Sequence, residues 1–181
     1  AGATPFGRMT AFHGQMGMYV RALSYMLSHG ADGLRQVAED AVLNANYIKA
    51  RLSVAMTPAF ADGPCMHEAL FDDHWLEDTG VTTLDFAKAM IDEGYHPMTM
   101  YFPLVVHGAM LIEPTETESK AELDRFADAL TSIAVRAKAG DPSLKAAPVL
   151  APTRRLDETR AARQPKLRWK PEDVSARIAA E

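Results

Sequence analysis

Two short apolar runs, residues 98–102 and 109–112, stand between two helical patterns in this chain. Runs of four or five apolar residues bounded by turn residues predict strands. Pro103 ends the first run because it has no N–H to donate to a neighbouring strand. A weakly alternating run over residues 65–71 predicts a third strand. The sequence therefore predicts a small, mostly antiparallel sheet covered by helices, which is a fold of the α+β class.

Apolar residues at three- and four-residue steps predict the helices that would cover this sheet. Glycine is a common helix stop, so Gly30 should end the first helix. Thr82 with Asp85, and Ser119 with Glu122, have the spacing of a capping box and should begin the last two helices. The predicted helices cover residues 16–27, 34–52, 83–93 and 119 to about 140.

Composition divides the chain into three parts. Residues 1–52 contain the first two predicted helices, and residues 53–140 contain the predicted strands and the last two helices. Residues 141–181 are rich in Pro, Ala and charge and predict an extended arm with a short helix near 172–180. The arm is basic, with 9 basic and 6 acidic residues from 140 onward, against 10 and 18 before it. It could lie across its own domain or meet an acidic partner or an anionic substrate, and both interpretations stay open.

Composition also narrows the function classes. The net charge of −5 argues against nucleic acid as a partner. No apolar run approaches the roughly 18 residues that span a bilayer, so we expect no membrane partner. Cys65 is the only cysteine and leaves no internal disulfide, which fits a cytoplasmic protein best. His67-Glu68 lacks a second histidine at ligand spacing, so no metal site is predicted.

Several separated blocks of the sequence resemble one enzyme family. They are FGRMTAFHGQMGMYVRALSYML, GLRQVAEDAVLNANYIKARL, CMHEALF, GVTTLDFAKAMIDEGYHPMTMYFPL, MLIEPTETESKAELDRF and RRLDETRAARQPKLRW. They are similar to the C-terminal part of the pyridoxal-phosphate-dependent glycine dehydrogenase (decarboxylating), the P-protein of the glycine cleavage system. The likeness is strongest to subunit 2 of the bacterial two-subunit form, and it covers most of the chain in the right order.

The resemblance implies a function for the complete protein. Glycine would bind pyridoxal phosphate and lose its carboxyl group as CO2, and the aminomethyl group would pass to the lipoyl group of the H-protein. The implied partners are P-protein subunit 1, the H-protein and further subunits of an oligomer. The implied fold is the small C-terminal α/β domain of a fold-type I pyridoxal-phosphate enzyme, which would be residues 53–140. Residues 1–52 would then be the end of the large domain and the long connecting helices.

The lysine that such an enzyme needs is missing from this sequence. A pyridoxal-phosphate enzyme holds its cofactor on a lysine beside a phosphate cradle. The seven lysines are Lys49, Lys88, Lys120, Lys138, Lys145, Lys166 and Lys170. None has the Ser/Thr-His-Lys setting of the family, which would lie upstream of the FGR block. We therefore expect a C-terminal fragment that has no catalytic residue of its own and is inactive alone.

Some residues could still shape a substrate site. Arg154 and Arg155 suit a substrate carboxylate, because a guanidinium binds a carboxylate with two parallel hydrogen bonds. Alternatively they pair with nearby acids or with the acidic body. His13 could face the large domain and its cofactor. Four residues that precede the last predicted helix could line the entrance for substrate or the lipoyl arm, or could instead cap that helix. These four are Glu113, Thr115, Glu116 and Thr117.

Other prominent side chains are better explained by structure. His67 should be partly buried in its strand, with its imidazole hydrogen-bonded to the backbone, and Tyr101 and Phe102 should pack in the core. The methionines before Gly30 should pack in the core or at a domain interface. They are Met9, Met16, Met18 and Met26.

Two rival functions remain open. The chain could be the small domain of another pyridoxal-phosphate enzyme, such as an aminotransferase or a desulfurase. It could also be a non-catalytic interaction module that binds a protein through its methionine face and basic arm.

Overall fold

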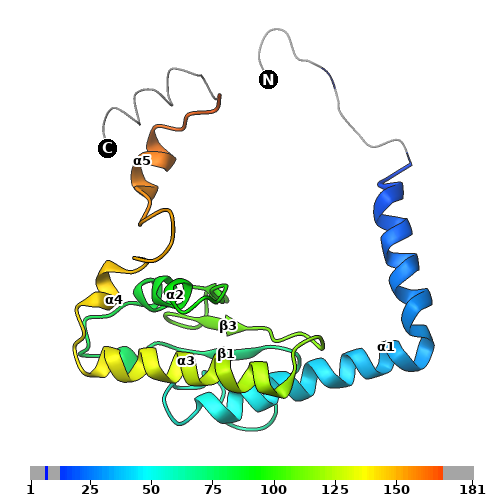
Figure 1. Ribbon diagram of the computed structural model, residues 1–181, viewed down its shortest axis with the longest axis horizontal. Coiled ribbons are helices and arrows are strands. Elements are labelled where there is room, and N and C mark those ends of the chain that lie inside the picture. Colours follow the sequence, from blue (N-terminus) through cyan, green and yellow to red (C-terminus); the bar gives the residue numbers. More distant parts are fainter. Residues whose placement is uncertain (1–6, 8–12, 169–181) are drawn as a thin grey trace.

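A computed structural model describes Gly7 and residues 13–168 (Figure 1). Met9 and the helix expected near 172–180 lie outside the described residues. The first element, α1 (Met16–Leu52), consists of two helical limbs that meet at Gly30, whose φ of 64° and ψ of −175° are not helical. The prediction that glycine separates two helices here is confirmed, and Figure 1 shows the first limb turned away from the rest of the domain.

The sheet has three antiparallel strands in the order β1-β3-β2. They are β1 (Ala69–Phe71), β2 (Thr99–Met100) and β3 (Met110–Ile112), each shorter than the apolar run that predicts it. Ala69 pairs with Ile112, and Phe71 with Met110. Because side chains alternate along a strand, these four side chains share one face of the sheet, and all four are buried. The α+β prediction is confirmed for this small antiparallel sheet with helices.

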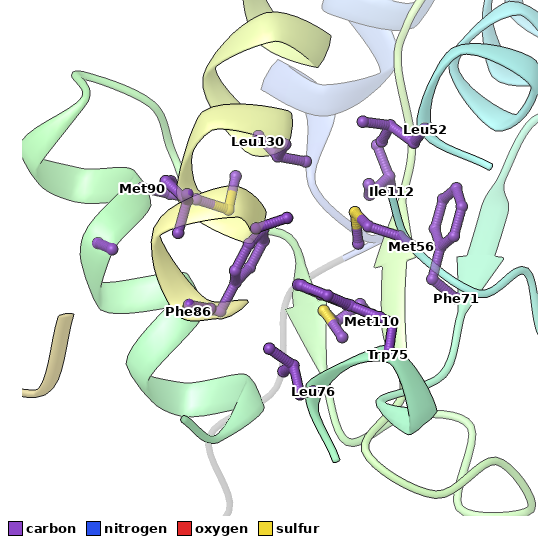
Figure 2. Packing of buried hydrophobic residues seen from close by; sticks show 14 of the residues in the cluster. Leu52, Met56, Phe71, Trp75, Leu76, Phe86, Met90, Met110, Ile112 and Leu130 are labelled. Carbon is purple, nitrogen blue, oxygen red and sulfur yellow. The ribbon is translucent and has the colours of Figure 1, made fainter. Parts of the chain in front are cut away.

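The core lies between that face of the sheet and the helices α1, α2 (Thr83–Asp92) and α3 (Lys120–Lys138). Figure 2 shows Phe86 and Met90 of α2 and Leu130 of α3 in the same buried cluster as Met110 of β3. Trp75, in the 3-10 helix η1 (His74–Leu76), packs edge-to-face on Phe86 at 5.1 Å between ring centroids. Burying large apolar side chains is the main favourable contribution to such a fold.

Side-chain caps begin α2 and α3 where the sequence places them. Thr82 and Asp85 form the full capping box, in which each side chain accepts from the other residue's backbone N–H. At α3, Ser119 Oγ accepts from the N–H of Glu122 at 3.2 Å. The Glu122 carboxylate pairs with Arg125, so the structure shows the serine half of the second box.

The basic arm begins on the body of the domain. A short helix, α4 (Ser143–Ala146), puts Leu144 into the core with none of its surface exposed, and Ala147 is also buried. The next helix, α5 (Glu158–Arg163), has no buried residue and stands off the body in Figure 1. The extended arm predicted from residue 141 therefore becomes extended only after Ala147.

Several sequence-based predictions are wrong. Residues 65–67 are not a strand, because the Cys65 N–H and C=O are both bonded by the Asn46 amide of α1. The His67 side chain is 54% exposed and faces Glu68. Tyr101 and Phe102 are exposed rather than in the core. The methionines that the structure describes in the first limb of α1 are also exposed, so they do not pack in this core, whereas their packing at a domain interface stays a prediction. Those methionines are Met16, Met18 and Met26.

Candidate functional site

The loop between β3 and α3, residues 113–119, borders a cavity in the described part of the chain. This cavity, here called the β3–α3 groove, has a volume of about 490 Å³. Apolar side chains form much of its wall, and carboxylates stand at its rim. The residues that matter here are Tyr95, Met98, Leu111, Phe126, Glu113 and Glu118.

Two residues of α1 hold the loop in place. Asn44 Nδ2 donates to the Thr115 carbonyl at 2.9 Å, and the Tyr25 hydroxyl donates to Glu116 Oε1 at 2.9 Å. The bond to this carboxylate raises the pKa of Tyr25. The Thr115 and Thr117 hydroxyls bond each other at 2.7 Å. The loop is therefore fastened to both limbs of α1.

The four loop residues singled out in the sequence do not cap α3. Ser119 is the N-cap, whereas Glu116 and Thr115 contact α1. The capping interpretation is therefore wrong for Glu113, Thr115, Glu116 and Thr117. Glu113 and Thr115 line the groove, which leaves the binding interpretation in place.

The groove carries uncompensated negative charge. The carboxylates of Glu113 and Glu118 have no hydrogen-bond or ion-pair partner within the residues that the structure describes. Burial and the charge of Glu122 raise the pKa of Tyr95, which also lines the groove. A surface with aromatic and apolar side chains next to carboxylates that lack a partner favours a ligand with a positive charge at the end of an apolar chain, such as an arginine side chain.

The two candidate arginines lie elsewhere. Arg155 Nη1 is 2.7 Å from Asp85 Oδ1, and its Nε donates to the Ala147 carbonyl at 2.7 Å. The Nη2 of Arg155 donates a third hydrogen bond, to the Leu144 carbonyl, at 3.2 Å. Arg154 makes one long bond, 3.5 Å, to the Pro148 carbonyl. Neither arginine lines the groove.

His13 is exposed, with a left-handed φ of 58°, and precedes α1. The groove lining does not include it. The structure therefore brings Glu113 and Thr115 together at the groove but does not gather His13, Arg154 and Arg155 around them.

Sequence reasoning missed the residues that fasten the loops. Asn44 and Asn46 sit inside a helix, where asparagine is a weak helix former because its amide competes for backbone hydrogen bonds. Two asparagines inside a helix indicate that their amides form hydrogen bonds with backbone outside that helix. Here Asn44 donates to the Thr115 carbonyl and Asn46 to the Cys65 carbonyl.

A pair of carboxylate–histidine contacts was also missed. Asp72 Oδ2 lies 2.8 Å from His74 Nδ1, and Asp73 Oδ1 lies 2.7 Å from His107 Nδ1. The hydrogen bond to Asp72 raises the pKa of His74. The Asp73 contact ties the loop between β2 and β3 to the residues that follow β1.

The lysines that the structure describes do not fit a pyridoxal-phosphate site. Lys49 Nζ donates to the carbonyls of Phe60 and Gly63 at 2.6 and 2.9 Å, so its ammonium is held by backbone. Lys120 Nζ is 2.7 Å from Asp124 and lies over the Tyr47 ring. Of the lysines in the described part of the chain, none lines the groove. We therefore derive no catalytic step through this cofactor from the present residues.

Two further observations concern other kinds of site. Over residue 7 and residues 13–168, no group of three or more His, Cys, Asp or Glu side chains could hold a metal ion. No helix in this described part combines the length and apolar character needed to cross a membrane.

Comparison with known proteins gives one consistent family. The model of the glycine dehydrogenase C-terminal domain matches residues 37–146. A relative from Caulobacter vibrioides, named probable glycine dehydrogenase (decarboxylating) subunit 2, is 78% identical over 98% of this chain and 34% of the relative. Relatives with the same name from Kosmotoga olearia and Bacillus cytotoxicus are each 48% identical. They match over 92% and 90% of this chain, and over 35% and 33% of their own lengths.

The chain thus spans about a third of the length of the curated relatives it matches. The matched region contains α1 from residue 37 onward, the sheet, α2, α3 and α4, which supply most of the core described above. Since the family model covers more than half of the sequence, the chain belongs to the family of glycine dehydrogenase C-terminal domains.

Proposed function

We propose that this chain acts as the C-terminal domain of a pyridoxal-phosphate-dependent glycine dehydrogenase (decarboxylating). In the proposed reaction glycine loses its carboxyl group as CO2, and its aminomethyl group passes to the lipoyl group of the H-protein. The observation that carries the proposal is the 78% identity to the Caulobacter vibrioides relative over 98% of this chain. Identity at this level, spread over nearly the whole chain, supports a shared role for the domain.

The chain would contribute shape and contacts rather than the cofactor lysine. The lysines that the structure describes do not fit that role, so pyridoxal phosphate would be bound mainly by residues outside this sequence. The small antiparallel sheet with helices is compatible with the small domain of a fold-type I enzyme. The partners proposed are subunit 1, in keeping with the relatives' name of subunit 2, the H-protein and further copies in an oligomer.

Within this domain, the groove and the exposed arginine are the candidates for substrate contact. Glu113 and Thr115 would border the path for substrate or the lipoyl arm, with Glu116 and Thr117 shaping the same loop. Arg154 is the better arginine for a carboxylate, because the donors of Arg155 are already engaged. The last candidate, His13, precedes α1 and would face the larger domain.

A domain exchange tests the proposal. The C-terminal third of the Caulobacter vibrioides relative is replaced by this chain, and release of labelled CO2 from carboxyl-labelled glycine is measured with H-protein and subunit 1 present. We expect the chimera to keep the parent's rate within about tenfold, since a tenfold loss corresponds to only about 1.4 kcal/mol of barrier. We expect the 181-residue chain alone to release no CO2.

Two controls make the exchange decisive. The parent lacking its C-terminal third should be inactive, and circular dichroism should show the chimera folded like the parent. A folded chimera with no activity above the truncated parent would contradict the proposed function.

A further inference from the structure

The β3–α3 groove and the basic arm are complementary in charge and in apolar character. The groove has aromatic and aliphatic walls and two carboxylates without a partner in the described part of the chain. Every residue from 152 to 168 is exposed, and the arm carries arginines next to exposed leucines. We propose that this groove binds one segment of the basic arm, residues 156–168, of a second copy of this chain. The inference goes beyond the proposed function and gives the groove another occupant than the substrate or lipoyl group considered there.

The groove offers one site for an arginine stem and another for its head. Tyr95 and Phe126 contact each other edge-to-face at 5.2 Å between centroids, and Met98 and Leu111 extend this apolar wall. Arginine buries its methylene groups along such a surface while its guanidinium stays at the rim. An aromatic ring also attracts a guanidinium that lies over its face. Glu113 and Glu118 would receive the charge.

The arm offers the matching groups. Arg160 and Arg163 are three residues apart on α5 and so lie on neighbouring positions of one helical face. Neither side chain has a partner in the part of the chain that the structure describes. Leu156 and Leu167, near the two ends of the segment 156–168, are 65% and 88% exposed. Exposed leucines beside unpaired arginines are typical of a segment that becomes covered in an assembly.

The geometry favours an arm from another copy. The groove is lined by the first two turns of α3, through Glu122, Leu123 and Phe126. The arm leaves the body beyond α4, which follows the other end of α3, and a helix of 19 residues is about 28 Å long. Arg155 fixes the start of the arm against Asp85 there, and α5 points away from the body in Figure 1. Exchange of an arm between identical chains is a low-cost route to a symmetric dimer.

Charge exchange tests this arrangement on the full 181-residue chain. One variant carries Glu113→Lys and Glu118→Lys in the groove, and another carries Arg160→Glu and Arg163→Glu in the arm. Sedimentation velocity measures the dimer dissociation constant of each alone and of an equal mixture. We expect wild type to dimerise and each variant alone to dimerise at least about tenfold more weakly, because like charges then face each other at both contacts.

The mixture should restore association. A lysine groove would meet a glutamate arm at one contact, and a glutamate groove would meet an arginine arm at the other. A charge-matched control, Asp62→Lys with Glu77→Lys, changes the net charge equally at exposed positions outside the groove and should dimerise like wild type. Circular dichroism establishes that each variant is folded before it is compared.

Three results would overturn the proposal. The first is a wild-type chain that stays monomeric at the highest soluble concentration, including one whose own arm fills the groove. The second is a dimer that neither charge reversal weakens, which would place the contact on another surface such as the exposed apolar face of α1. The third is a mixture that associates no better than its two components.

Discussion

Arg155 reaches back 70 residues to Asp85, with 2.7 Å between Nη1 and Oδ1. Asp85 also accepts from the N–H and the hydroxyl of Thr82, so one carboxylate caps α2 and fastens the arm. Burial raises the pKa of Asp85, but its hydrogen bonds to Thr82 and Arg155 lower the pKa by more, leaving it below its ordinary value. The guanidinium further binds two carbonyls of the α4 region. This pair therefore joins α2, α4 and the arm.

Arg155→Ala should lower the free energy of unfolding by about 2 kcal/mol, since it leaves a nearly buried carboxylate and two carbonyls short of a donor. Arg154→Ala is the matched control, because it removes only one bond of 3.5 Å and should change stability by less than about 0.5 kcal/mol. Urea titration followed by far-ultraviolet circular dichroism measures both. Equal losses in the two variants would contradict the role given to Arg155.

Stability should depend on acid pH through Asp141. Its hydrogen bonds with Ser143, together with Arg136, lower the pKa of Asp141 from 3.8 to about 2. A carboxyl with a lowered folded-state pKa contributes stability that is complete above about pH 4 and is lost as the pH falls through about 2. Wild type should therefore exceed Asp141→Asn in stability at pH 7, and the difference should vanish near pH 2. Urea midpoints across this range measure the difference, and Asp62→Asn should follow wild type throughout. A wild-type advantage that persists unchanged to pH 2 would contradict the assignment.

The sequence predicted the helices well because their determinants are local. The break at Gly30 and the capping box of Thr82 and Asp85 depend on residues a few positions apart. The wrong strand at residues 65–67 depends on a distant residue. Asn46, on α1, binds both the N–H and the C=O of Cys65, so that backbone is not free to pair with a strand.

The candidate site was predicted only in part for the same reason. Glu113 and Thr115 stood out locally and do line the groove. Their fastening by Asn44 and the tie between Tyr25 and Glu116 span 71 and 91 residues. Tyr101 was expected in the core, but its φ of 57° turns the chain and its hydroxyl accepts from the Leu84 N–H. Contacts at these separations follow from the fold and not from a local pattern.

Gly108→Ala should be strongly destabilising. Gly108 has a φ of +56°, and an added Cβ would overlap the carboxyl group of Asp73, which holds His107. We expect a loss of about 3 kcal/mol, from backbone strain plus overpacking. Gly140→Ala, with a φ of +72° and open space around its Cβ, isolates the strain and should cost about 1 kcal/mol. Asp73→Ala added to Gly108→Ala should recover part of the loss in urea titrations. Equal losses in the free energy of unfolding for Gly108→Ala and Gly140→Ala would contradict the overlap with Asp73.

Leu144→Ala tests whether the start of the arm belongs to the core. Leu144 is fully buried in α4, so its truncation should leave a cavity and lower the free energy of unfolding by about 3 kcal/mol. Leu150 is 78% exposed a few residues later, and Leu150→Ala should change the same quantity by less than about 0.5 kcal/mol. Because the two substitutions remove the same atoms from one segment, the difference between them measures burial alone. A cooperative urea transition that shifts for Leu144→Ala and not for Leu150→Ala would show that α4 unfolds together with the sheet. Two equal, small effects would instead mean that the cooperative unit ends before α4, and that burial of Leu144 contributes nothing to its stability.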